Sequence, residues 1–278
     1  MYSSLLIILD YQILKVKSDL CDKIESMKRL LTILCLILLL GGCAGKKEPE
    51  PEIPQPVEVV DREPERTRAD RLLHLNAIWD KNYAINNDYW GDITVGHYFI
   101  YPFVKGATND TYIRTDWKTM NYDEEGSVFL DYRNNMGDQN LIIYGHYVYA
   151  SYDASGTHKF TMLRQLMSKD NYKDNRFITL HLKDELRVYE IGLVYYCDTY
   201  VADDGNRYTN PALQYYHLNY DPDYFYEYLA NAKNASFYET DVELSADDEL
   251  LTLQTCVAGN EDLREIVLAR LIRTEKLR

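Results

Sequence analysis

The sequence has little positive charge relative to its negative charge. Its 278 residues include 30 Lys and Arg against 44 Asp and Glu, which gives a formal net charge of -14. A protein that binds DNA or RNA needs a basic surface to neutralise phosphates. The composition therefore argues against a nucleic-acid partner.

Long hydrophobic runs are also missing. The most apolar stretch, residues 30–42, follows Met27-Lys28-Arg29. It is shorter than the roughly 20 residues that a transmembrane helix needs, but it matches the roughly 7–15 residues of a signal-peptide core. We therefore expect residues 27–42 to be a cleaved signal peptide. Residues 1–26 have no place in this pattern, and we expect them to come from a start codon assigned too far upstream.

The apolar stretch ends in Leu40-Gly41-Gly42-Cys43. This tetrad resembles a bacterial lipobox, in which the signal is removed and the cysteine is diacylated. The resemblance implies that Cys43 anchors the protein to the extracytoplasmic face of a bacterial membrane. The alternative is an ordinary secretory signal that contains a cysteine. Residues 43–67 then form the lipidated end and a linker whose Pro and Glu content favours an extended chain.

Cysteines and metal-binding motifs are few. Once Cys21, Cys35 and Cys43 are assigned to the removed or lipidated segments, only Cys197 and Cys256 remain in the folded body. Two cysteines do not make a disulfide framework. We expect Cys197 to be a small buried apolar residue, and a Cys197–Cys256 disulfide is the alternative. No H-E-x-x-H or paired C-x-x-C motif occurs, so no metal or other cofactor is expected.

Residues 68–278 have the pattern of one mainly β (α+β) domain. An amphipathic helix is predicted over 68–88. Further helices are predicted over 160–167 and after Asp221-Pro222, where Asp221 caps the helix and Pro222 takes its first position. Period-two runs rich in β-branched and aromatic residues predict strands at 99–104, 127–131, 140–146, 177–182, 186–197, 250–256 and 266–272. Seven or eight strands with few helices predict a closed seven- or eight-stranded β-barrel, with one helix inserted before the 250–256 strand.

Two of these strands end on reactive side chains, His146 and Cys256. If residues 250–256 and 264–272 form a hairpin with 257–263 as its loop, Arg264 lies beside Cys256. Arg270 would then be about 20 Å further along the strand. Among these arginines only Arg264 is within reach of the thiol.

The three side chains suit nucleophilic catalysis. A cysteine attacks as its thiolate, which a nearby imidazolium and guanidinium both favour. His146 can protonate a leaving amine, and Arg264 can hold a substrate carbonyl or a developing oxyanion. The pattern predicts an acyl-transfer enzyme.

The motif Thr-Leu-x-Thr-Cys at 252–256, with Arg264 eight residues later and Tyr144-Gly145-His146 about 110 residues earlier, resembles the sortase family, in particular its class B branch. The resemblance covers about residues 70–278. Further matching segments are 88–93, 101–106, 126–134 and the helix at 222–233. One departure is Val95-Gly96-His97-Tyr98, which stands where class B members commonly carry a Pro-Gly-Thr-Asn-like turn.

The resemblance implies transpeptidation by a sortase-type barrel. Cys256 would attack the threonine carbonyl of a C-terminal sorting signal, with motifs in the class varying around Asn-Pro-x-Thr. His146 would protonate the departing amine and Arg264 would stabilise the intermediate. Thr255 would contact substrate, the alternative being that it only fills the strand. The implied partners are a surface protein that bears a sorting signal and an amine acceptor of the cell wall or a pilin.

Two other functions compete with this interpretation. A cysteine peptidase would form the same acyl-enzyme, and water would then hydrolyse the thioester. A non-catalytic surface-binding lipoprotein would instead use its 26 tyrosines to bind glycan or protein, with Cys256 buried.

Overall fold

The computed structural model describes residues 65–97, 99–149 and 158–278. The expected upstream extension, the signal peptide, Cys43 and nearly all of the linker lie outside the described residues. Within these ranges, no helix combines the length and the apolar character that crossing a membrane requires.

The described residues form five short or medium helices and nine strands. The helices are α2 (Glu65–Ile85), the 3-10 helix η1 (Thr161–Met167), α3 (Lys169–Asn175), the 3-10 helix η2 (Pro211–Leu213) and α4 (Pro222–Ala235). The strands are β1 (Tyr89–Val95), β2 (Phe99–Val104), β3 (Val128–Leu130), β4 (Asn140–Tyr144), β5 (Phe177–Leu182), β6 (Glu185–Val201), β7 (Arg207–Thr209), β8 (Leu250–Val257) and β9 (Asn260–Lys276).

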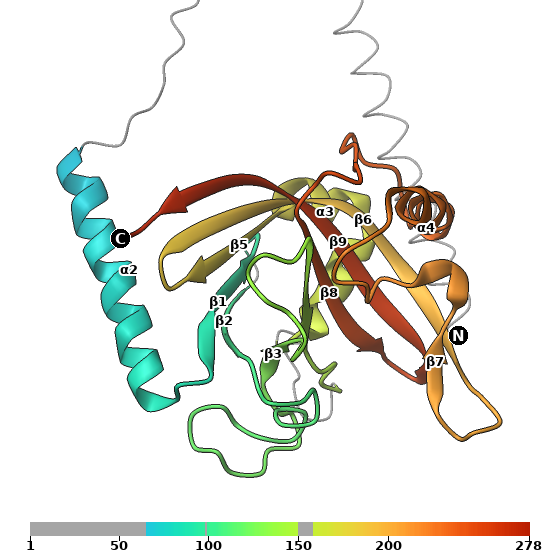
Figure 1. Ribbon diagram of the computed structural model, residues 1–278, viewed down its shortest axis with the longest axis horizontal. Helices are drawn as coiled ribbons and strands as arrows, with labels where there is room; N and C mark the ends of the chain where they lie inside the picture. The colour runs from blue at the N-terminus through green and yellow to red at the C-terminus, as the bar shows by residue number, and fades with distance from the viewer. Residues whose placement is uncertain (1–64, 98, 150–157) are drawn as a thin grey trace, which may run out of the picture. The chain divides into compact units, whose positions relative to one another are not determined.

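Eight of these strands close into a barrel, which confirms the predicted fold. Their order is β5-β1-β2-β3-β4-β8-β9-β6, and pairing of β5 with β6 closes the ring, while β7 extends β6 outside it. The β2–β3 and β4–β8 pairs are parallel and the other pairs are antiparallel. Figure 1 shows the long β6 and β9 running together across the molecule.

Alternating side chains of the strands fill the barrel, and α4 covers its outside. Leu251 and Leu253 of β8 point into the barrel core. On the outer face, Phe225 and Tyr228 of α4 pack in a second core with Ile266 of β9. As predicted, α4 begins after Asp221, whose carboxylate accepts a hydrogen bond from the Asp223 N–H at 3.0 Å.

Helix α2 lies against the C-terminal end of the chain. Arg71 pairs with Glu275 of β9 at 3.0 Å, and the Asn76 amide donates to the Leu277 carbonyl at 3.2 Å. Figure 1 shows the C-terminus beside this helix. The helix begins and ends three residues earlier than the predicted 68–88, so residues 65–67 belong to it and not to the linker.

The hairpin of β8 and β9 is tighter than predicted. We predicted a loop over 257–263, but β9 already begins at Asn260, which pairs with Val257. A bulge between Cys256 and Val257 takes up the extra residues of β9. Cys256 therefore remains directly opposite Arg264 although the connecting turn is short.

Candidate active site

Cys256 and Arg264 are cross-strand neighbours at the end of the β8–β9 hairpin. They are register partners, as are the adjacent residues Thr255 and Glu265. Because side chains alternate along a strand, Thr255 and Glu265 point into the barrel, where both are buried. Cys256 and Arg264 therefore point to the opposite face, and each is only partly buried.

His146 is brought to the same edge by the parallel pairing of β4 with β8. Tyr144 is the register partner of Gln254, and the Gly145 N–H donates to the Gln254 carbonyl at 3.2 Å. Two residues further along both strands, His146 and Cys256 reach the same level. Both side chains line the same two cavities.

The ring of His146 is oriented by a backbone carbonyl. Its Nε2 atom lies 2.8 Å from the carbonyl oxygen of Ile113. A carbonyl can only accept, so this contact assigns the proton of the neutral ring to Nε2 and leaves Nδ1 as the atom that can accept a proton. Burial lowers the pKa of His146, and the cationic side chains of Arg114 and Lys159 lower it further. The ring is therefore mostly neutral at pH 7.

The guanidinium of Arg264 is held by the bulged start of β9. Its Nη1 atom donates to the carbonyls of Glu261 and Leu263, both at 2.8 Å. A guanidinium has five N–H donors, so donors remain for a ligand on the cavity side. The bulge thus fixes a cation next to the thiol of Cys256.

Two cavities meet at Cys256 and His146. The smaller has a volume of about 300 Å³ and is lined on its apolar side by Ile113, Phe129 and Tyr144. The larger has a volume of about 860 Å³ and is lined by charged side chains of both signs, namely those of Arg114, Arg207, Arg264, Asp123, Glu124, Glu125 and Glu261. The thiol thus stands between an apolar cavity and one lined by charged side chains.

The second cysteine of the folded body has a different environment. Cys197 is fully buried, and its Sγ atom lies 3.5 Å from the Leu213 carbonyl oxygen. Burial raises the pKa of its thiol to about 12. Both Cys197 and Cys256 are free thiols, so Cys197 is the small buried residue that we expected and does not pair with Cys256.

Thr255 lies apart from the cavities. It is fully buried and is not among the residues that line either of them. This position favours the interpretation in which Thr255 fills the strand. Neither Ile113 nor the acidic segment 123–125 has a motif or periodicity that points to the site, so neither was predicted from the sequence.

Comparison with known proteins finds sortase B proteins by sequence and by structure. No family model matches the chain. The chain is 25% identical over 261 residues to sortase B of Staphylococcus aureus, covering 89% of this chain and 98% of the relative. It is 32% identical over 177 residues to sortase B of Listeria monocytogenes, covering 62% of this chain and 64% of the relative. The solved structure of Clostridium perfringens sortase B matches 70% of this chain and 99% of its own, with a TM-score of 0.58 and 25% identity.

Proposed function

Since this chain belongs to the class B sortases and is a cysteine transpeptidase, we propose that Cys256 is its nucleophile, with His146 and Arg264 as its catalytic partners. The observation that carries this proposal is the cross-strand pairing of Cys256 with Arg264 at the edge where His146 also lies. A thiol, a proton carrier and a fixed hydrogen-bond donor for the oxyanion suit acyl transfer through a thioester.

The first half of the reaction forms the acyl-enzyme. Neutral His146 takes the thiol proton at Nδ1, and the sulfur of Cys256 attacks the carbonyl carbon of the substrate threonine. The oxygen becomes an oxyanion, which the Arg264 guanidinium stabilises. As the tetrahedral intermediate collapses, the carbon–nitrogen bond breaks and the leaving amine takes the proton from Nδ1. A thioester to Cys256 remains.

The second half transfers the acyl group to an amine. His146 removes a proton from the incoming amine, whose nitrogen attacks the thioester carbon, and the Cys256 thiolate leaves. We assign the apolar cavity beside Phe129 and Tyr144 to the sorting signal. The larger, charged cavity would receive the acceptor, because the carboxylates of Asp123 and Glu125 can accept hydrogen bonds from an amine.

Peptide transfer tests this function. The full chain is incubated with a labelled peptide that carries an Asn-Pro-x-Thr-type sorting motif and with an amine acceptor. We expect cleavage after the threonine and a new amide to the acceptor. Cys256→Ala should lose both products, whereas Cys197→Ala should keep them. Equal activity of Cys256→Ala would contradict the proposal, and hydrolysis without transfer at saturating acceptor would favour a peptidase.

We further propose that the enzyme is held at the extracytoplasmic face of the membrane by a lipid on Cys43. The support is the lipobox-like Leu40-Gly41-Gly42-Cys43, which follows an apolar run with a basic start. The linker after Cys43 contains Pro49, Pro51, Pro54 and Pro56, a composition that keeps a chain extended.

Fractionation of cells tests the anchor. Wild-type protein should take up a labelled fatty acid and sediment with membranes. Cys43→Ser should take up no label, whereas Cys197→Ser serves as a control that keeps it. Unchanged labelling of Cys43→Ser would contradict lipidation at this residue.

A further inference from the structure

A third cavity lies at the opposite end of the barrel from the thiol. It has a volume of about 610 Å³ and is lined by residues of α2 and β1, of the β5–β6 turn and of the end of β9, where Lys276 lies. Arg264 and Lys276 stand near the two ends of β9, about 40 Å apart along the strand. Chemistry at Cys256 therefore does not account for this cavity.

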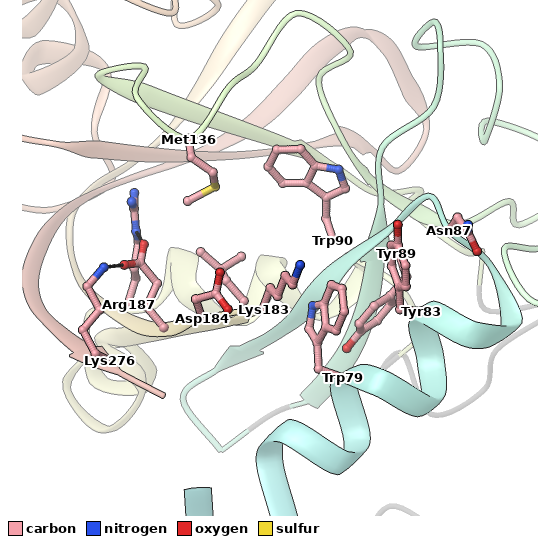
Figure 2. Close-up of a pocket in the computed structure, with 12 residues that line it drawn as sticks. Trp79, Tyr83, Asn87, Tyr89, Trp90, Met136, Lys183, Asp184, Arg187 and Lys276 are labelled. Atoms are coloured by element: carbon pink, nitrogen blue, oxygen red, sulfur yellow. Dashed lines mark hydrogen bonds and ion pairs between the residues drawn. The ribbon is translucent and has the colours of Figure 1, made fainter. Parts of the chain in front are cut away.

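Aromatic rings form much of its wall. Trp79 stacks on Tyr83 with ring centroids 4.6 Å apart and an interplanar angle of 18°, and it also contacts Tyr89 at 6.0 Å. Figure 2 shows Trp90 on the other side of the cavity, facing Trp79 and Lys183. Cations also lie over these rings: Lys183 and Arg278 are 5.6 Å and 5.7 Å from the Trp79 centroid, and Lys105 is 5.1 Å from the Trp90 centroid. Trp79 therefore presents its edge to the cavity, and Trp90 supplies the flat face that suits a ligand with an apolar ring face of its own.

Within the part of the chain that the structure describes, the wall contains buried polar atoms without a hydrogen-bond partner, among them the indole nitrogen of Trp79. Trp79 is only 6% exposed, yet its Nε1 atom donates to no acceptor among the described residues. Figure 2 shows this nitrogen on the edge of the indole nearer to Lys183. A buried N–H without an acceptor is unfavourable, so a ligand oxygen placed in the cavity would satisfy it.

The charged residues of the cavity mostly neutralise one another. Glu185 accepts from Arg187 at 2.6 Å and from Lys276 at 2.5 Å, and Arg187 also pairs with Glu249 at 3.2 Å. At the exposed β5–β6 turn, the cavity also has the ammonium group of Lys183 and the carboxylate of Asp184, which lies 3.8 Å from Arg278 Nε. The cavity therefore suits an uncharged ligand that both donates and accepts hydrogen bonds.

We propose that this cavity is a carbohydrate-binding site for a neutral, N-acetylated pyranose oligosaccharide. A sugar ring would lie against Trp90, an acetamido carbonyl would accept from Trp79 Nε1, and hydroxyl groups would pair with Lys183 and Asp184. A proline-rich peptide also stacks on aromatic rings, but it lacks the N–H donors that the carboxylate of Asp184 calls for. An alkyl chain lacks both donors and acceptors. The site would hold a glycan while acyl transfer proceeds at the other end of the barrel.

Titration of the full chain with a β-1,4-linked tetramer of N-acetylglucosamine tests this site. We expect saturable binding by calorimetry and a change in tryptophan fluorescence. Trp90→Ala should weaken the affinity at least tenfold. Trp79→Phe, which keeps an aromatic ring and removes the N–H, should weaken it several-fold. Lys183→Ala, on an exposed turn, should weaken it about twofold to fivefold without affecting folding.

Trp117→Phe is the matched control, because Trp117 is the remaining tryptophan of the chain and does not line the cavity. Its affinity for the tetramer should equal that of the wild type, and all four variants should keep peptide-transfer activity with a small amine. The proposal is overturned if wild-type protein does not bind the tetramer. It is also overturned if Trp90→Ala and Lys183→Ala both bind it unchanged, or if a decaproline peptide binds in its place.

Discussion

The Nε2 atom of His146 lies 2.8 Å from the carbonyl oxygen of Ile113, a residue that precedes it by a long segment of chain and belongs to no strand. In the reaction that we propose, this contact determines which ring nitrogen would exchange protons with Cys256 and with the substrate. The same carbonyl closely approaches Gly126, which has a φ of +53°. The geometry of the imidazole therefore depends on the backbone of the 105–127 segment.

We predict that His146 titrates below the usual value of about 6.5 for histidine. Burial and the cations of Arg114 and Lys159 lower its pKa, so the folded protein binds this proton more weakly than the unfolded chain does. Arg114→Ala should raise the pKa, and Lys118→Ala, which removes an exposed cation elsewhere, should not. The check is the titration of the His146 ring signals by NMR. A wild-type midpoint above 6.5 would contradict the assignment.

Gly126→Ala should impair catalysis through His146. A Cβ atom at Gly126 would lie 2.2 Å from the Ile113 oxygen and 2.6 Å from the Tyr112 oxygen, both of the backbone. One of these carbonyls must move, and the positive φ adds strain of about 1–3 kcal/mol. We expect kcat/KM to fall more than tenfold and the pH profile to shift. Gly137→Ala, with no atom within 4 Å of the added Cβ, should leave both unchanged; equal effects would contradict the role of the carbonyl.

The two free thiols should differ in reactivity. Cys197 is buried and its pKa is raised to about 12, whereas Cys256 lines two open cavities. Iodoacetamide at pH 8, followed by peptide mapping, should modify Cys256 first and abolish transfer, because attack requires a thiolate. Modification of Cys197 before Cys256 would show that the cavities do not expose the nucleophile.

Glu265 should make the protein less stable as the pH rises. It is 2% exposed, and burial raises the pKa of its carboxyl to about 8. Its folded pKa lies above the unfolded value, so the stabilisation is complete below about pH 4.5 and is lost as the pH rises through 8. Glu265→Gln should remove this pH dependence and raise the free energy of unfolding by on the order of 3 kcal/mol at pH 8.5. Urea unfolding at pH 5.5 and 8.5 measures the pH dependence of the free energy of unfolding, and Glu227→Gln, at an exposed position, is the control. An equal pH dependence in the wild type and in Glu265→Gln would contradict a raised pKa of Glu265.

The sequence was sufficient to predict the barrel and the pairing of Cys256 with Arg264, because period-two patterns and strand lengths are local properties. Strand β1 was missed as a strand because one of its inward positions is Gly91, which interrupts the apolar alternation. A Cβ atom there would lie 2.2 Å from the His181 carbonyl oxygen, so the glycine is required by a neighbour about 90 residues away. The hairpin loop was predicted too long because Asn260-Glu261-Asp262 has the composition of a turn.

The Ile113 carbonyl and the aromatic cavity could not be predicted in this way. A backbone carbonyl has no signature in the sequence, and the approach of Ile113 to His146 depends on how the 105–127 segment folds. Trp79 and Trp90 belong to different elements, and Lys183 lies on a turn far along the chain. Only the closure of the barrel brings their side chains around one cavity.

The central claim is that Cys256 carries the acyl group between two substrates. Intact-mass spectrometry of the full chain, mixed with a sorting-motif peptide and no acceptor, tests it most directly. We predict an added mass equal to the peptide portion up to its threonine, mapped to Cys256, and its disappearance when an amine is added. An adduct on another residue, or turnover by Cys256→Ala, would contradict the account.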